Sequence, residues 1–167
     1  SLIIARQIGE DKFKNFFKNL SLLKPINFEL EEIGKPLNFN WEKCKLETVS
    51  YGHGITTTPL QAAAAYASIT NGGYLIKPTL QFKKKIDNEK KVSVISKNTS
   101  DEINKILRKV VTDNKGTANF ANIFGYDVGG KTGTSKSYKE KNKTINTFIS
   151  IFPTSEPKYV LLTILDN

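Results

Sequence analysis

The segment Lys131-Thr132-Gly133-Thr134 has the residue types best suited to chemistry in this sequence. In a strand the side chains alternate, so Lys131 points to one side and Thr132 and Thr134 point to the other. A lysine ammonium attracts a terminal carboxylate, threonine hydroxyls can hydrogen-bond it, and a backbone N–H beside the reacting carbonyl can serve an oxyanion hole. We expect Gly133 to leave the backbone open to the close approach of an extended peptide.

The same residues satisfy a phosphate-binding pattern, because Gly125 to Thr132 spells G-x-x-x-x-G-K-T. A P-loop needs a strand before the glycines and a helix that begins at the Lys-Thr pair, where its N-terminus binds phosphate. No apolar helical stripe follows Thr132 before Ile145, and Ala118 to Phe124 makes a poor buried strand. A P-loop nucleotide-binding domain is therefore kept as an alternative, which predicts nucleotide affinity that depends on Lys131.

A longer set of motifs resembles the class B penicillin-binding proteins, most of all the division-type, monofunctional peptidoglycan D,D-transpeptidases. The motifs are Y-G-H-G-I-T-T-T-P-L-Q at Tyr51 to Gln61, an alanine-rich helix that ends at Asn71-Gly72-Gly73, Gly116-Thr117-Ala118, and Gly125-Tyr126 before the Lys131 to Thr134 segment. The resemblance implies an α+β fold, in which an antiparallel sheet of about three strands packs with helices. It also implies a partial penicillin-binding/β-lactamase-like transpeptidase domain.

The resemblance gives roles to the four residues. Lys131 would match the lysine of the family's third box, which helps to hold the second-box serine, and the backbone N–H of Thr134 would match an oxyanion-hole donor, so both are expected to be catalytic. Thr132, Gly133 and Thr134 are expected to bind substrate, with the two hydroxyls on the terminal carboxylate of a donor peptide or a β-lactam. In the family, the serine of an S-x-x-K box forms an acyl-enzyme. The chain begins after this box and the S-x-N box, so we expect the nucleophile to be missing and the chain alone to be inactive.

The resemblance further implies an enzyme of cell-wall (peptidoglycan) biosynthesis that cross-links stem peptides at cell division. Its expected partners are peptidoglycan stem peptides, β-lactams as inhibitors and division-complex proteins, and no metal or organic cofactor is expected. The expected location is the bacterial inner membrane with this domain in the periplasm, and the anchor would lie outside the chain. An elongation-type transpeptidase, a β-lactam-hydrolysing relative and a noncatalytic basic binding module remain alternatives.

Composition excludes some classes and leaves others open. The formal net charge of +9 comes from 25 basic and 16 acidic residues, and only Arg6 and Arg108 of the basic residues are arginine. Nucleic-acid binders favour arginine for bidentate contacts, so no nucleic-acid partner is expected. Cys44 is the single cysteine, which excludes an intrachain disulfide and predicts an inert thiol. The absence of methionine indicates a partial or processed chain.

Periodicity and capping signals predict the elements that carry the motifs. We expect a first helix at Leu2 to Ile8 and a second one that carries an aromatic core stripe. A third helix should follow a Thr58/Gln61 capping box and stop at Gly72, and a fourth should follow a Thr99/Glu102 capping box. The first stripe is Phe13, Phe16, Phe17 and Leu20, and the second is Ile103, Ile106, Leu107, Val110 and Val111. The segment from Leu22 to Leu46 should be irregular.

The last third of the chain changes to strand periodicity. We expect strands at 127–134, 147–153 and 159–166, antiparallel because the links between them are too short for helical crossovers. Strand-like pieces should flank a basic turn from Lys83 to Lys91, and His53 should be a loop residue. The chain is interpreted as one partial domain over 1–167, helical to about 115 and sheet from about 126. We expect it to be at best marginally stable alone, which cooperative thermal unfolding would contradict.

Overall fold

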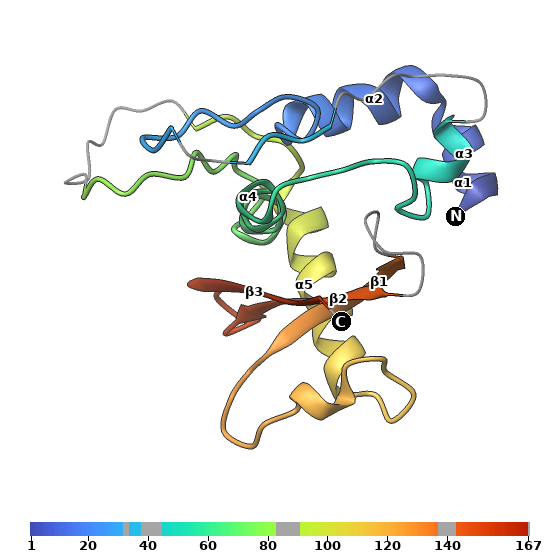
Figure 1. Ribbon diagram of the computed structural model, residues 1–167. Helices are drawn as coiled ribbons and strands as arrows, with labels where there is room; N and C mark the ends of the chain where they lie inside the picture. Colours follow the sequence, from blue (N-terminus) through green and yellow to red (C-terminus); the bar gives the residue numbers. More distant parts are fainter. Residues whose placement is uncertain (32–33, 38–44, 83–90, 137–142, 167) are drawn as a thin grey trace. The chain divides into compact units, whose positions relative to one another are not determined.

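The computed structural model describes residues 1–31, 34–37, 45–82, 91–136 and 143–166. These residues form two compact units, Ser1–Ala65 with Leu75–Val94 and Tyr66–Tyr74 with Ile95–Asn167, and each unit is considered by itself. Helices and a three-stranded antiparallel sheet confirm the α+β class (Figure 1). The predictions for Cys44 and for the basic turn at 83–90 lie outside the described residues.

The first unit begins with three helices, α1 (Leu2–Ile8), α2 (Glu10–Asn19) and α3 (Lys45–Val49). Leu20 is buried, but Phe16 is 38% exposed, so the predicted core stripe is wrong at Phe16. The rings of Phe13 and Phe17 instead pack edge-on, with centroids 4.9 Å apart. Helix α3 begins at the end of the segment expected to be irregular, because five residues are too few to show a helical period.

Helix α4 (Pro59–Thr70) begins with the predicted capping box. The Gln61 backbone N–H donates to Thr58 Oγ1 (3.2 Å), and the Thr58 N–H donates to Gln61 Oε1 (3.0 Å). The Gln61 side chain is 1% exposed, and its Nε2 donates to the backbone oxygens of Ser21 (2.9 Å) and Lys24 (2.8 Å). One buried amide therefore joins the start of α4 to the turn at 21–24. Gly72 has a φ of 93°, as its predicted role as a helix stop requires.

Helix α5 (Lys97–Thr112), in the second unit, begins three residues earlier than predicted. Ser96 is the N-cap, and its Oγ accepts a hydrogen bond from the Thr99 N–H (3.1 Å). The predicted Thr99/Glu102 capping box is therefore wrong, because a serine upstream supplies the cap. Glu102 forms an exposed ion pair with Lys105 instead (2.7 Å).

The buried face of α5 is partly polar. Leu107 and Val111 are buried as predicted, whereas Ile106 is 59% exposed, which contradicts its place in the core stripe. Ser100 and Asn104 occupy buried positions because they serve the end of α4: Ser100 Oγ accepts from Gly72 N (3.0 Å), and Asn104 Nδ2 donates to Thr70 O (3.0 Å). Backbone groups left unpaired at a helix end thus select these polar side chains.

The sheet has the order β1-β2-β3, from β1 (Gly129–Lys136), β2 (Thr144–Phe152) and β3 (Tyr159–Asp166). Both pairings are antiparallel as predicted, although β2 begins three residues earlier than expected. Helix α5 packs on β1, and Ile149 and Ile151 of β2 are buried. Between Gly73 and Ile95 the described residues form only an isolated bridge, so strands are not confirmed there.

Candidate functional site

Strand β1 places Lys131 to Thr134 on one edge of the sheet. Among the described strands only β2 pairs with β1, so the other edge of β1 has no strand beside it. Three of these four residues are exposed, and Thr132 is half-buried. The unpaired N–H and C=O groups of an edge strand can bind an extended peptide by adding it as a further strand.

Lys131 and the two threonines lie on opposite faces of β1, as the alternation predicts. In the register, Lys131 opposes the buried Ile149, whereas Thr132 opposes Phe148. The Lys131 Nζ donates to the backbone oxygen of Thr132 (2.7 Å) and lies 3.5 Å from Thr132 Oγ1. Across the described part of the chain, no carboxylate pairs with Lys131, so its positive charge is available to a ligand.

The two threonine hydroxyls have partners that the sequence reasoning did not assign to the site. Thr132 Oγ1 donates to Thr117 Oγ1 (3.0 Å), and Thr134 Oγ1 donates to Asn146 Oδ1 of β2 (3.1 Å). The Gly116-Thr117-Ala118 motif was a signal for Thr117. Asparagine is depleted in strands, so its presence within the apolar pattern of β2 was a signal for Asn146.

Gly133 is required by packing within the sheet. A Cβ added there would lie 2.6 Å from Thr147 Oγ1, and this hydroxyl donates to Gly133 O (3.2 Å). Real Cβ atoms do not approach a neighbour so closely, so the side chain of Thr147 occupies the space that glycine leaves. Openness to a substrate is thus not the sole reason for glycine at this position.

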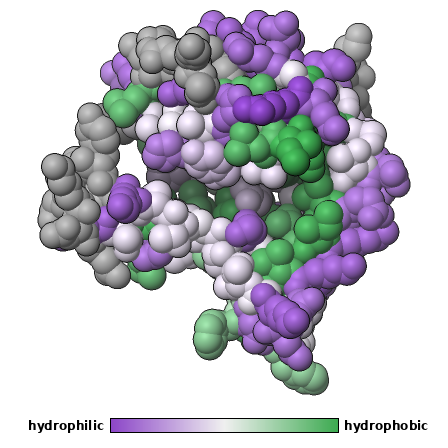
Figure 2. All heavy atoms as spheres, turned by 90° about the vertical axis from the view of Figure 1, so that its right-hand side faces the viewer, coloured by the Kyte–Doolittle hydropathy of each residue, from purple (hydrophilic) through white to green (hydrophobic). Residues whose placement is uncertain are grey.

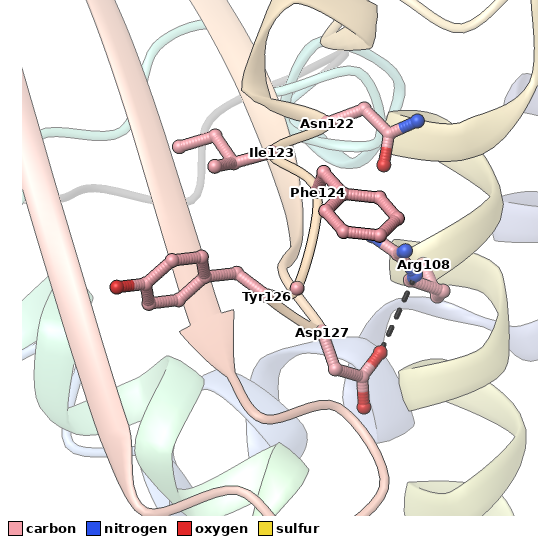
Figure 3. A pocket seen from close by; sticks show the side chains of 7 residues that line it. Arg108, Asn122, Ile123, Phe124, Tyr126 and Asp127 are labelled. Atoms are coloured by element: carbon pink, nitrogen blue, oxygen red, sulfur yellow. Dashed lines mark ion pairs between the residues drawn. The ribbon is translucent and has the colours of Figure 1, made fainter.

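An ionic cluster fixes the backbone just before β1. Arg108 of α5 pairs with Asp127 (3.3 Å; Figure 3) and also donates to the Val128 backbone oxygen (2.7 Å). The Asp127 carboxylate accepts from the Thr154 hydroxyl and from the Ser155 N–H (2.9 Å). Burial alone would raise the pKa of Asp127, but the hydrogen bonds from Thr154 and Ser155, together with the Arg108 charge, outweigh it and lower the pKa.

The same cluster forms part of a pocket of about 420 Å³ (Figure 3). Its lining is Arg108 and the six consecutive residues from Asn122 to Asp127. Arg108 and Asp127 already pair with each other, so the two charged groups of the pocket serve the structure. Across the described residues, no group of His, Cys, Asp or Glu is placed to hold a metal ion.

Two literal matches to the missing boxes precede Lys131 and were overlooked in the sequence. Ser21 to Lys24 spells S-x-x-K, and Ser96 to Asn98 spells S-x-N. Ser21 lies in a turn after α2 with a φ of 58°, rather than at the start of a helix that would place Lys24 one turn away. Ser96 is the N-cap of α5. Neither match therefore has the local geometry of a nucleophilic serine or of its partner.

The P-loop alternative and His53 can also be judged from the structure. Lys131 and Thr132 lie within β1 and not at the start of a helix, and Ala118 to Phe124 contains a 3-10 turn instead of a strand, so the geometry contradicts a P-loop. The His53 ring stacks on exposed Tyr51 (centroids 6.3 Å apart), and its backbone N–H donates to Thr48 O (3.0 Å). His53 is therefore a loop residue, as predicted.

Comparisons with known proteins agree with this geometry. The family described as the penicillin binding protein transpeptidase domain matches residues 1–167. A probable peptidoglycan D,D-transpeptidase of Caulobacter vibrioides is 32% identical over 99% of this chain and 30% of its own length.

The transpeptidase domain of Burkholderia pseudomallei penicillin-binding protein 3 superposes with a TM-score of 0.87 at 26% identity, over 99% of this chain and 52% of that one. For penicillin-binding protein 3 of Mycobacterium tuberculosis complexed with ampicillin, the TM-score is 0.85 at 22% identity, over 99% and 42%. The chain thus spans about a third of the length of its curated relatives.

Proposed function

The chain belongs to the penicillin-binding protein transpeptidase family, and from this premise we propose that it forms the Lys-Thr-Gly side of the active site of a peptidoglycan D,D-transpeptidase. The enzyme cross-links stem peptides of the cell wall at division. One observation carries the proposal: the open edge of a single strand carries two threonine hydroxyls and an ammonium that has no carboxylate partner among the described residues. A short polar edge of this kind suits a peptide that ends in a carboxylate.

Each residue of the segment has a role in this proposal. The Lys131 ammonium supplies positive potential, the Thr132 and Thr134 hydroxyls bind the terminal carboxylate, and the Thr134 N–H stabilises the oxyanion. The backbone around Gly133 runs alongside the donor peptide. The Arg108–Asp127 pair and Thr154 hold the start of β1 against α5, which keeps this edge in place.

The nucleophile is supplied by an S-x-x-K serine outside these 167 residues. Its hydroxyl oxygen attacks the carbonyl of the penultimate residue of the donor stem peptide, an ester forms, and the terminal D-alanine leaves with a proton on its amine. An amine of a neighbouring stem peptide then attacks the ester. The new amide is the cross-link, and the serine hydroxyl recovers its proton.

The family also supports proposals on ligands and location. β-Lactams inhibit the enzyme by acylating the same serine, consistent with the ampicillin complex of the mycobacterial structure. The domain lies in the periplasm of a bacterium, and the enzyme is held at the inner membrane near division-complex proteins. No helix in the described residues is both long enough and apolar enough to cross a membrane.

The test uses the full-length protein and a fluorescent penicillin. We expect covalent labelling that survives denaturation, that unlabelled ampicillin prevents, and that is lost when the S-x-x-K serine is replaced by alanine. Lys131→Ala should slow the labelling strongly without unfolding the protein. Absence of labelling in a folded, full-length protein would contradict the proposal, and tight ATP or GTP binding lost in Lys131→Ala would favour a nucleotide-binding function.

A further inference from the structure

Asn146 lies directly across the β1–β2 ladder from Thr134. Directly opposed residues share a face of the sheet, so Asn146 is on the same face as both threonines of the segment. The Thr134 hydroxyl donates to Asn146 Oδ1 (3.1 Å), and Asn146 Nδ2 lies 3.5 Å from Thr144 Oγ1. The polar edge of β1 thus continues onto the neighbouring strand.

A hydroxyl has a single proton, which it can donate to one acceptor at a time. While Thr134 donates to Asn146, its oxygen presents lone pairs to a ligand, and lone pairs repel a carboxylate. Thr132 is in a different position, because its partner Thr117 is itself a hydroxyl with a proton to offer. The carbonyl oxygen of Asn146 can only accept. A carboxylate must therefore take the proton of Thr134 away from Asn146 before that hydroxyl can bind it.

We propose that Asn146 is a positioning residue that holds the hydroxyl proton of Thr134 away from the substrate, and thereby lowers the affinity of the site for donors that end in a carboxylate. The inference rests on the proposed function of Thr134 in carboxylate binding. It assigns to Asn146 a specificity role, exerted through Thr134 and not by contact with the reacting atoms. Removal of the acceptor frees the hydroxyl and strengthens the binding of the carboxylate.

The experiment measures thiol release by the full-length enzyme from two donors that differ only at their end. An N-acyl-D-alanyl thioglycolate ends in a carboxylate, and the matching thioglycolamide does not. In Asn146→Ala we expect KM for the thioglycolate to fall about threefold to tenfold, the range of one neutral hydrogen bond. The kcat values and KM for the thioglycolamide should stay within about twofold, because a change in KM alone reports binding.

Three further variants separate this role from a structural one. Asn146→Asp keeps an acceptor and adds a negative charge, so it should raise KM for the thioglycolate only. In a Thr134→Val background, Asn146→Ala should have no effect, since the hydroxyl that it frees is absent. Thr163→Ala changes an exposed threonine on the same face, opposite Phe148 and not beside Thr134, and should alter neither KM.

An equal change in KM for both donors, or a rise in KM for the thioglycolate in Asn146→Ala, would overturn the inference and leave the proposed function intact. An effect of Asn146→Ala that persists in Thr134→Val would overturn it as well. If the unaltered enzyme neither releases thiol from either donor nor reacts with the fluorescent penicillin, the proposed function fails, and the inference fails with it.

Discussion

The outer strands β1 and β3 pair with the same central strand and have the same length, yet they differ in almost every residue. Strand β1 reads G-G-K-T-G-T-S-K, and its first two residues are buried. Strand β3 reads Y-V-L-L-T-I-L-D, but Leu161, Ile164 and Leu165 are 54%, 43% and 60% exposed. The more apolar strand is therefore the less covered one.

The difference shows that the residue composition of a strand reflects the environment that its side chains contact. The glycines and hydroxyls of β1 suit a polar ligand at an open edge. The apolar side chains of β3 suit burial, and the described residues do not supply the cover. Exposed apolar side chains are not confined to β3, since the face of the molecule drawn in Figure 2 also carries apolar side chains among hydrophilic ones. Relatives that are about three times as long have further chain with which to cover such a strand.

The largest expected effect is on the rate of acylation, which should depend on a lysine of β1 and not on a lysine beside β3. Lys131→Ala in the full-length enzyme should lower the rate of acylation by penicillin about 10²- to 10³-fold, the typical loss when one preorganised electrostatic group is removed. Lys158→Ala, an exposed lysine just before β3, should leave the rate unchanged. Stopped-flow labelling measures both, and equal rates for the two variants would remove Lys131 from the site.

The next prediction concerns the packing of β1. Gly133→Ala should lower the free energy of unfolding by about 1–3 kcal/mol, because the new Cβ would meet Thr147 Oγ1. Thr147→Ala combined with Gly133→Ala should recover a large part of this loss. Urea unfolding of the two single variants and the double variant would measure the recovery. Additive losses would show that Thr147 is not what requires glycine.

A smaller effect depends on pH and on the start of β1. The folded-state pKa of Asp127 is lowered, so its stabilising contribution is complete above the unfolded pKa of about 3.9 and is lost as the pH falls through the folded pKa. At pH 7, Asp127→Asn should cost about 1 kcal/mol for this half-exposed group, and the cost should shrink below about pH 4. Asp166→Asn, at the end of β3, is the matched control. A cost for Asp127→Asn that does not change between pH 7 and pH 3 would contradict the prediction.

The smallest expected effect lies on β3. Leu161→Ser should change the stability of the 167-residue chain by less than about 0.5 kcal/mol, since the side chain is 54% exposed. It should also reduce the fluorescence of a bound hydrophobic dye. Ile151→Ala on β2, where the side chain is fully buried, should cost about 2–5 kcal/mol, which is enough to unfold a chain of marginal stability. Similar losses for both variants, by thermal or urea unfolding, would show that β3 is covered within this chain.

Much of the fold follows from local signals in the sequence. The capping box of Thr58 and Gln61, the stop at Gly72 and the antiparallel strands were predicted because each depends on a few neighbouring residues. One kind of error arose where a distant group decided the outcome. Ile106 is exposed, whereas Ser100 and Asn104 lie on the buried face of α5 because backbone groups at the end of α4 need hydrogen-bond partners. The apolar periodicity of α5 contains no signal for this requirement.

The candidate site shows the same limit. The segment from Lys131 to Thr134 was found from its residue types, but Asn146 was not, because the link between them depends on the register of β1 against β2. Thr147 was missed for the same reason. Register aligns residues that lie more than ten positions apart, and a shift of one residue would send each side chain to the other face.

Gln61 has a consequence for the chemical ageing of the molecule. Hydrolysis of its side-chain amide, the slow deamidation that glutamine undergoes in stored proteins, would replace an NH₂ group with an oxygen that donates nothing. The backbone oxygens of Ser21 and Lys24 would then face a carboxylate inside the first unit, at a site where the side chain is 1% exposed. The burial that keeps water from this amide therefore also protects the first unit from a change of one functional group.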